Sequence, residues 1–169
     1  MYRNRIFNAG SAREFKFTID KLREDGGLFV SLNGCFDLPH RGHIELLHYA
    51  RSLCVCNSMS NGFVIAGLNS DTSVKSIKGD KRPIINEVGR AKFLLSTRLV
   101  DYVYVFDDIT PNNFLKIVKP AIHVNDSSFG EYCVERKDLD EMGTMLSLFP
   151  KIKDTLSTTE IIEIILERC

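Results

Sequence analysis

The sequence predicts an α/β fold: a single domain built on a mainly parallel, five-stranded sheet with helices on its faces. Short apolar segments typical of buried strands alternate with helical hydrophobic patterns along the chain, and this alternation favours parallel strands joined by helices. The 169 residues, of which 44% are hydrophobic and 26% charged, suit one globular domain spanning residues 1–169. Within it we expect residues 1–12 to form a flexible N-terminal extension.

Five apolar segments are the expected strands. They are rich in the β-branched and aromatic residues that strands prefer, and they cover residues 28–32, 63–68, 100–106, 121–124 and 145–149. The first two are apolar along almost their whole length, as expected of buried strands.

Apolar residues at helical spacing fill the segments between the strands. The first such pattern spans residues 15–22 and ends at the stop signal Gly26–Gly27. Three more patterns occur within residues 46–53, 88–95 and 157–166. The last of them opens at Ser157 with the spacing of a capping box. A further helix is expected with Thr110 as its cap and Pro111 in its first turn.

Composition and charge exclude several classes of protein. The 22 Lys and Arg residues balance 22 Asp and Glu residues, so the chain lacks the basic bias of a protein whose main partner is nucleic acid. No apolar run reaches the length of about 18 residues that spans a membrane, and the N-terminus lacks the apolar core of a signal peptide. The five cysteines are scattered without a CxxC pair, which predicts reduced thiols in the cytoplasm and no protein-held metal.

Charge is uneven along the chain although its sum is zero. Residues 71–92 contain six cationic and three anionic side chains, whereas residues 126–169 contain five and ten. The basic segment is either a solvated loop or part of an anion-binding site, and charge alone leaves both interpretations open.

The strongest candidates for a functional site follow the first expected strand, from Asn33 to His43. Ligands of parallel α/β sheets bind beyond the carboxyl ends of the strands. Gly34 permits a tight turn there, and Gly42 leaves the start of the following helix open to a large ligand. His40 and His43 are three residues apart, so both imidazoles can donate to one bound phosphate. The pattern therefore predicts a phosphate site at a helix N-terminus.

The tetrad His40-Arg41-Gly42-His43 resembles the HxGH signature of the cytidylyltransferase-like nucleotidyltransferase superfamily. Five further segments, in the same order, are similar to bacterial heptose-phosphate adenylyltransferases: residues 33–37, 68–75, 78–83, 98–103 and 157–159. This resemblance implies a Rossmann-like fold. It also implies transfer of a nucleoside monophosphate from a nucleoside triphosphate, with ATP favoured, to a sugar phosphate such as heptose 1-phosphate, with release of pyrophosphate.

The same resemblance implies roles for particular residues. Two histidines and two lysines would be catalytic: His40, His43, Lys75 and Lys78. Contacts to the nucleotide would come from Asn33, Gly34, Cys35, Phe36, Asp37, Gly42, Asn125, Asp126, Ser157, Thr158 and Thr159. The acceptor phosphate would meet Arg82 and Arg90. Mg²⁺ bound mainly through the triphosphate would be the cofactor, and the expected assembly is a homodimer with residues 98–106 as one candidate contact.

Several positions depart from the family pattern. Asp126 and Thr155 stand where relatives have glycine, and Pro39 replaces an apolar residue. Two alternatives therefore stay open: a cytidylyltransferase that uses CTP and glycerol phosphate or another alcohol phosphate, and a non-catalytic nucleotide-binding homologue. A fragment of a class I aminoacyl-tRNA synthetase fits less well, because the sequence has no KMSKS-like loop and its net charge is zero.

Overall fold

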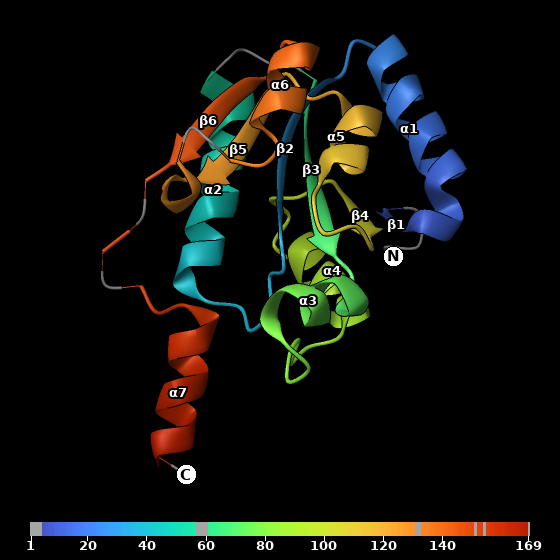
Figure 1. Ribbon diagram of the computed structural model, residues 1–169. Coiled ribbons are helices and arrows are strands. Elements are labelled where there is room, and N and C mark those ends of the chain that lie inside the picture. The colour runs from blue at the N-terminus through green and yellow to red at the C-terminus, as the bar shows by residue number, and fades with distance from the viewer. Residues whose placement is uncertain (1–4, 57–60, 131–132, 151, 154, 169) are drawn as a thin grey trace.

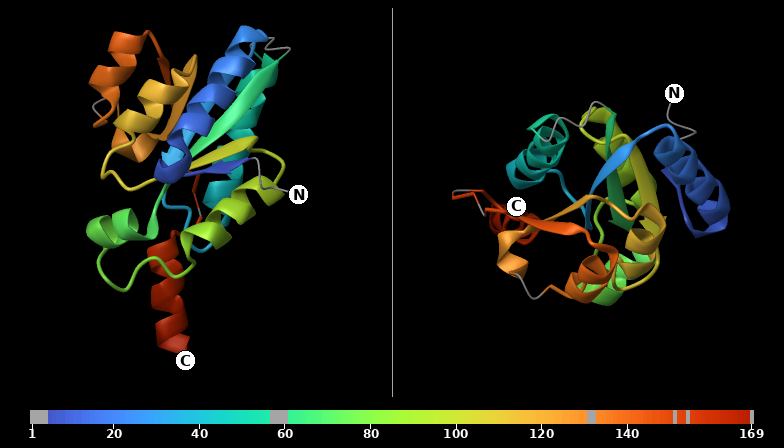
Figure 2. Two further views of the ribbon diagram at one scale, coloured as in Figure 1. Left: turned by 90° about the vertical axis from the view of Figure 1, so that its right-hand side faces the viewer. Right: turned by 90° about the horizontal axis from the view of Figure 1, so that it is seen from above.

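The computed structural model describes residues 5–56, 61–130, 133–150, 152–153 and 155–168. Its central feature is a sheet in the order β1-β4-β3-β2-β5-β6, with helices packed on both faces (Figure 1, Figure 2). The strands are β1 (Ile6–Phe7), β2 (Leu28–Gly34), β3 (Gly62–Asn69), β4 (Tyr102–Phe106), β5 (Ile122–Asp126) and β6 (Met145–Phe149). All five pairings in this order are parallel, which confirms the expected α/β class.

The five expected strands correspond to β2–β6, and β1 adds a sixth to the described sheet. Ile6 lies opposite Val103 and Phe7 opposite Tyr104 of β4. The expectation of five strands is therefore wrong by one, because two residues are too few for a hydrophobic period to show in a sequence. Part of the expected N-terminal extension thus belongs to the sheet, while residues 1–4 lie outside the described residues.

Seven α-helices lie in the described part of the chain: α1 (Ala12–Glu24), α2 (Arg41–Cys56), α3 (Asp71–Lys78), α4 (Glu87–Ser96), α5 (Asn112–Val118), α6 (Arg136–Met142) and α7 (Thr158–Arg168). Two short 3₁₀ helices accompany them, η1 (Ala9–Ser11) and η2 (Ser127–Phe129). The expected cap at Thr110 is wrong by one residue, because Pro111 occupies the N-cap position of α5. Helices α3 and α6 were not predicted, since seven or eight residues show too few turns of an apolar pattern. The equally short α5 was predicted only because Thr110 and Pro111 indicated its start.

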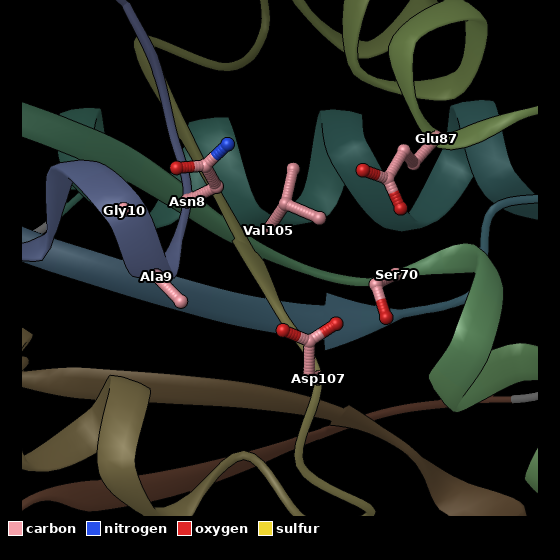
Figure 3. Close-up of a pocket in the computed structure, with 7 residues that line it drawn as sticks. All are labelled: Asn8, Ala9, Gly10, Ser70, Glu87, Val105 and Asp107. Carbon is pink, nitrogen blue, oxygen red and sulfur yellow. The ribbon is translucent and has the colours of Figure 1, made fainter.

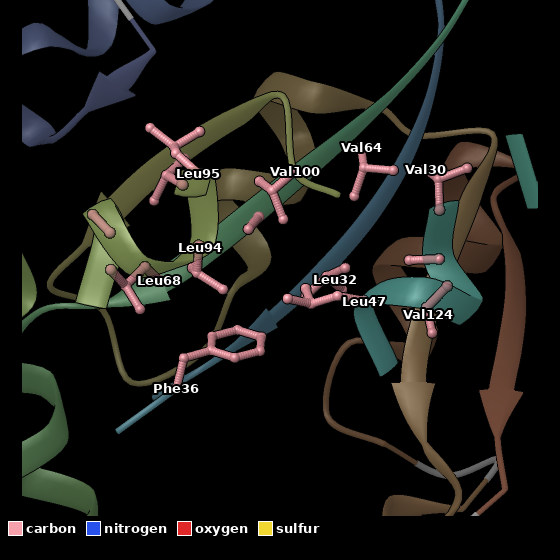
Figure 4. Close-up of a cluster of buried hydrophobic side chains, with 14 of the residues drawn as sticks. Val30, Leu32, Phe36, Leu47, Val64, Leu68, Leu94, Leu95, Val100 and Val124 are labelled. Atoms are coloured by element: carbon pink, nitrogen blue, oxygen red, sulfur yellow. The ribbon is translucent and has the colours of Figure 1, made fainter. Parts of the chain in front are cut away.

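Two hydrophobic cores, one on each face of the sheet, hold the helices in place. The first lies under α2 and α4 and includes Leu32, Leu47 and Leu94 (Figure 4). The second lies under α1, α5 and α6 and includes Phe15 and Phe114. Burying one such side chain contributes about 1.5–3 kcal/mol. The cores therefore fix the positions of the strand ends.

Strand β2 lies where the order of strands reverses. The chain continues from β2 to β3 on one side, whereas β5 lies on its other side. In open α/β sheets, ligands bind beyond the carboxyl ends of the strands at this switch point. The loop after β2 and the start of α2 occupy that position, which is where the sequence analysis places the functional site.

Helix α7 projects from the end of the domain at which the carboxyl ends of the strands lie (Figure 1, Figure 2). The predicted capping box is present: the Glu160 N–H donates to Ser157 Oγ at 3.3 Å, and the Ser157 N–H donates to Glu160 Oε2 at 2.6 Å. Toward its C-terminus, Ile165 and Leu166 are exposed. Among the described residues, no helix has both the length and the apolar character to cross a membrane.

Candidate active site

His40 and His43 form a stacked pair at the start of α2. Their ring centroids lie 3.7 Å apart with an interplanar angle of 26°, and the His43 N–H donates to the His40 carbonyl at 3.0 Å. Gly42 makes this arrangement fit, because a Cβ at that position would lie 3.1 Å from the His40 ring. The two imidazoles thus lie together at a helix N-terminus, where a phosphate would also meet free backbone N–H groups.

Burial favours the neutral form of both imidazoles. Burial lowers the pKa of His40, and burial together with the neighbouring His40 lowers the pKa of His43 to about 3. The Nδ1 atoms of both rings are buried and have no hydrogen-bond partner in the described part of the chain. Nε2 is therefore the nitrogen of each ring that is left to donate to a ligand, as a neutral N–H.

Phe36 packs against His43, with its ring in the core under α2. The two ring centroids lie 5.2 Å apart, and Phe36 is 3% exposed within the core under α2. Its φ of 48° lies in the left-handed region, and a Cβ at Gly34 would lie 3.3 Å from its ring. Gly34 and Phe36, which were expected to contact the nucleotide, thus shape the turn that presents His43.

Asp37 and Arg82, expected to contact the nucleotide and the acceptor phosphate, bind each other. Arg82 Nε donates to Asp37 Oδ2 at 2.7 Å, and the backbone N–H groups of residues 84 and 85 donate to the same carboxylate at 2.9 Å. Burial raises the pKa of Asp37, but these donors and the Arg82 charge outweigh burial and lower it. Asp37 therefore ties the loop between α3 and α4 to the loop after β2. The Arg82 side chain keeps an exposed fraction of 12%.

Arg90, the second expected ligand of the acceptor phosphate, is buried. Its guanidinium donates to the backbone carbonyls of Cys35 and Asn69. It also donates to the Ile85 carbonyl and, at 2.8 Å, to the Asp71 carboxylate. Its side chain has no exposed surface. In this structure Arg90 joins the ends of β2 and β3 to α3, and its contact with the acceptor phosphate stays a prediction.

Lys75 and Lys78 lie one turn apart on the exposed side of α3, directly after β3. Burial raises the pKa of the Cys35 thiol at the end of β2, and three nearby cations partly oppose this rise: Lys78, Arg90 and Arg82. The end of β2 therefore lies in a positive field, which favours bound anions.

The end of β5 carries Asn125 and Asp126, both expected to contact the nucleotide. Asn125 Nδ2 donates to Glu135 Oε1 at 2.9 Å, and Asn125 Oδ1 accepts from the Asp126 N–H at 3.0 Å. The Asp126 carboxylate caps η2 by accepting from the Ser128 N–H at 2.8 Å. On the neighbouring strand β2, Asn33 Oδ1 is buried and has no partner among the described residues. Asn125 is thus engaged within the protein, whereas Asn33 keeps an acceptor free.

The start of α7 reaches the same loop. Thr158 is 8% exposed, and its hydroxyl donates to the Asp37 carbonyl at 3.3 Å. Ser157 and Thr159 flank it and are exposed. Two helix N-termini, those of α2 and α7, therefore meet beside the histidine pair.

Three buried polar residues near this site were not predicted from the sequence, namely Ser31, His123 and Glu135. A signal for two of them was present. Ser31 and His123 interrupt apolar strands, and a polar side chain buried in a strand requires a hydrogen-bond partner. Glu135 lies in a polar segment without such a signal.

A separate hollow of about 230 Å³ lies beyond β1, β3 and β4 (Figure 3). It is lined by Asn8, Ala9, Gly10, Ser70, Glu87, Val105 and Asp107. None of these is an expected site residue, and the two carboxylates repel phosphates. Within the described residues, no group of three or more His, Cys, Asp or Glu side chains gathers in the way a metal site requires. The candidate active site is therefore the histidine pair and its surroundings.

Known proteins resemble the chain over most of its length. Residues 31–164 match the cytidylyltransferase-like family. The bifunctional protein HldE of Trichlorobacter lovleyi is 41% identical over 147 residues, which are 86% of this chain and 28% of HldE. That of Geobacter sulfurreducens is 38% identical over 146 residues, again 86% of this chain and 28% of the relative. The chain thus spans less than a third of the length of these relatives.

Solved structures share the fold. Pantoate-β-alanine ligase from Francisella tularensis superposes with a TM-score of 0.65 at 16% identity, over 96% of this chain and 77% of the ligase. A lipopolysaccharide core biosynthesis protein from Thermoplasma volcanium superposes with a TM-score of 0.55 at 18% identity, over 75% and 97% of the two chains. At these identities the likeness concerns the fold alone.

Because the family match includes the histidine pair, the α3 lysines and the start of α7, the chain belongs to the cytidylyltransferase-like family of nucleotidyltransferases.

Proposed function

We propose that the protein transfers a nucleoside monophosphate from ATP to a sugar phosphate of the heptose 1-phosphate type and releases pyrophosphate. The observation that carries this proposal is the stacked pair of His40 and His43 at the start of α2, at the switch point of the sheet. The similarity to HldE over 86% of the chain supports the choice of subfamily.

In this reaction an acceptor phosphate oxygen attacks the α-phosphorus, the bond to the β-phosphate oxygen breaks, and pyrophosphate leaves. No covalent bond to the protein forms, so the protein has to bring two anions together and stabilise negative charge. The Nε2–H donors of His40 and His43 and the free N–H groups at the start of α2 would meet the phosphates. Lys75 and Lys78 would add positive charge from α3.

Mg²⁺ is implied by the family resemblance, but the loop after β2 is not built to hold it. The Asp37 carboxylate has no exposed surface and is already bound by Arg82 and by two backbone N–H groups. We therefore expect Mg²⁺ to be bound by triphosphate oxygens and water, as is usual for this ion. None of the residue roles above depends on it.

Pyrophosphate release with ATP and with CTP, each paired with heptose 1-phosphate and with glycerol 3-phosphate, tests the proposal. We expect ATP with heptose 1-phosphate to give a kcat/KM at least about tenfold above the other three pairs. Turnover with CTP and glycerol 3-phosphate alone would establish a cytidylyltransferase instead. Nucleotide binding without turnover across a panel of sugar and alcohol phosphates would establish a non-catalytic homologue.

The same proposal includes a homodimer located in the cytoplasm. Free thiols are usual in that reducing compartment, and Cys35, Cys54 and Cys133 are free. Of the expected dimer contact, residues 98–106, the exposed Arg98 and its partly exposed neighbours remain candidates. Strand β4 lies inside the sheet between β1 and β3, and residues 103–106 are buried. Light scattering is expected to give twice the 19.2 kDa of one chain. A mass of one chain at micromolar concentration would contradict the dimer.

A further inference from the structure

Buried polar side chains run from β2 to the start of α6, on the face of the sheet that α1, α5 and α6 cover. Ser31 Oγ and His123 Nδ1, on the paired strands β2 and β5, lie 2.7 Å apart. His123 Nε2 lies 3.6 Å from Glu135 Oε1, and the same oxygen accepts from Asn125 Nδ2 at 2.9 Å. Ser31, His123 and Glu135 are each at most 3% exposed. The mechanism above uses none of these contacts.

Glu135 is held as an anion inside the protein. A buried carboxylate is costly unless neighbouring groups stabilise it. Burial raises the pKa of Glu135, but the His123 imidazole, its own backbone N–H and the Cys133 thiol outweigh burial and lower it. The surroundings of Glu135 are therefore built for its negative charge.

The hydrogen bond between Asn125 and Glu135 closes a loop. Asn125 lies near the end of β5, and Glu135 occupies the N-cap position of α6. Their side chains thus join the end of β5, from which η2 follows, to the start of α6. The same bond orients the Asn125 amide, because with Nδ2 directed at Glu135 its Oδ1 accepts from the Asp126 N–H. The start of the loop is thereby held at the carboxyl end of the sheet, beside β2.

We propose that Glu135 is a positioning residue for nucleotide binding, acting through Asn125 on the loop that begins at Asp126. This inference rests on the proposed function, since it takes the end of β5 as part of the nucleotide site. A loop that is open in the free protein has to be ordered when the ligand binds, at a cost in entropy. A loop already closed by Glu135 avoids part of that cost. Glu135 therefore acts on nucleotide affinity and leaves the chemical step unchanged.

Three variants of the full chain test this role. Glu135→Ala removes the acceptor for Asn125, whereas Glu135→Gln keeps a carbonyl oxygen for it. Glu141→Ala is the matched control, since this exposed α6 residue makes only a long ion pair of 3.9 Å with Lys137 among the described contacts. The measurements are the Kd of α,β-methylene ATP by calorimetry, KM and kcat for the nucleotide, and hydrogen exchange of residues 126–130.

We expect Glu135→Ala to raise the Kd and the KM at least about tenfold, to leave kcat within about threefold of wild type and to speed exchange of residues 126–130. Glu135→Gln should restore Kd and KM to within about threefold, and Glu141→Ala should match wild type. Should Glu135→Ala fail to fold, Glu135→Leu keeps most of the side-chain volume, offers Asn125 no acceptor and carries the same expectation.

An unchanged Kd in a folded Glu135→Ala variant would overturn the proposal, as would a fall in kcat at constant KM. Absence of analogue binding by the wild-type chain would overturn it as well. If the wild type binds the analogue but turns over no acceptor, the proposed activity fails while a tenfold weaker Kd in Glu135→Ala still supports the positioning role. The two failures are thus distinguishable.

Discussion

The charge state of His43 decides what the site can offer a polyphosphate. Burial and the stacked His40 ring hold its pKa at about 3, so at neutral pH the ring donates one N–H and carries no positive charge. The positive charge at the site comes instead from Lys75, Lys78 and the helix N-termini. The site therefore combines neutral N–H donors at the start of α2 with exposed cations on α3.

This depressed pKa makes protein stability depend on pH. The ordinary value of 6.5 applies to the unfolded chain, which therefore binds more protons at His43 than the folded chain does between about pH 3 and 6.5. Protonation of His43 therefore does not reduce the free energy of unfolding above pH 6.5, and it reduces that free energy progressively as the pH falls from 6.5 toward 3. We expect His43→Gln, which does not titrate, to lose less unfolding free energy in urea than wild type between pH 7 and pH 5. Equal losses would contradict a neutral His43.

Arg90 illustrates a charged residue whose role is structural. Arg90→Met leaves the partly exposed Asp71 carboxylate and three backbone carbonyls without their donor, and a buried acceptor left unpaired costs about 1–3 kcal/mol. We expect a loss of about that size in urea denaturation. Lys92→Met on the exposed side of the same helix is the control and should change stability by less than about 0.5 kcal/mol. Similar losses in both variants would contradict the role of Arg90.

At the scale of elements, most strands and helices could be predicted from their hydrophobic patterns, because the residues that face the core have to be apolar. Strands β2–β6 and helices α1, α2, α4 and α7 carry apolar patterns long enough to recognise. The short helix α5 was indicated by Thr110 and Pro111, whereas nothing of this kind indicated β1, α3 or α6. The location of the histidine pair in the candidate site could be predicted, because the pair follows the first long strand and ligands bind beyond the carboxyl ends of such strands. The mutual binding of Asp37 and Arg82 could not be predicted, because a sequence does not show which charged side chains meet inside the fold.

The start of α2 depends on Gly42. A Cβ there would lie 3.1 Å from Cε1 and Nδ1 of His40, so the ring has to move. Alanine favours a helix over glycine by about 0.5–1 kcal/mol, so Gly42→Ala should keep or slightly raise the melting temperature. We expect its kcat to fall about tenfold, because a displaced donor no longer fits the transition state. Ser52→Ala, further along α2, is the control. Wild-type kcat in Gly42→Ala would show that the position of the His40 ring does not matter.

For the whole molecule, the sheet brings distant segments to one place. The loop after β2, the α3 lysines after β3, the end of β5 and the start of α7 all lie at the carboxyl edge of the strands. Asp37 and Arg90 join several of these segments through buried hydrogen bonds. For the proposed reaction, the site would thus be assembled before two mutually repelling phosphates bind.

The steady-state rate of pyrophosphate release from ATP and heptose 1-phosphate, compared between wild type and His43→Ala, tests this account most directly. The account predicts turnover by the wild type and a kcat at least about a hundredfold lower in the variant, with a melting temperature that shows both proteins folded. Equal rates in two folded proteins would contradict it.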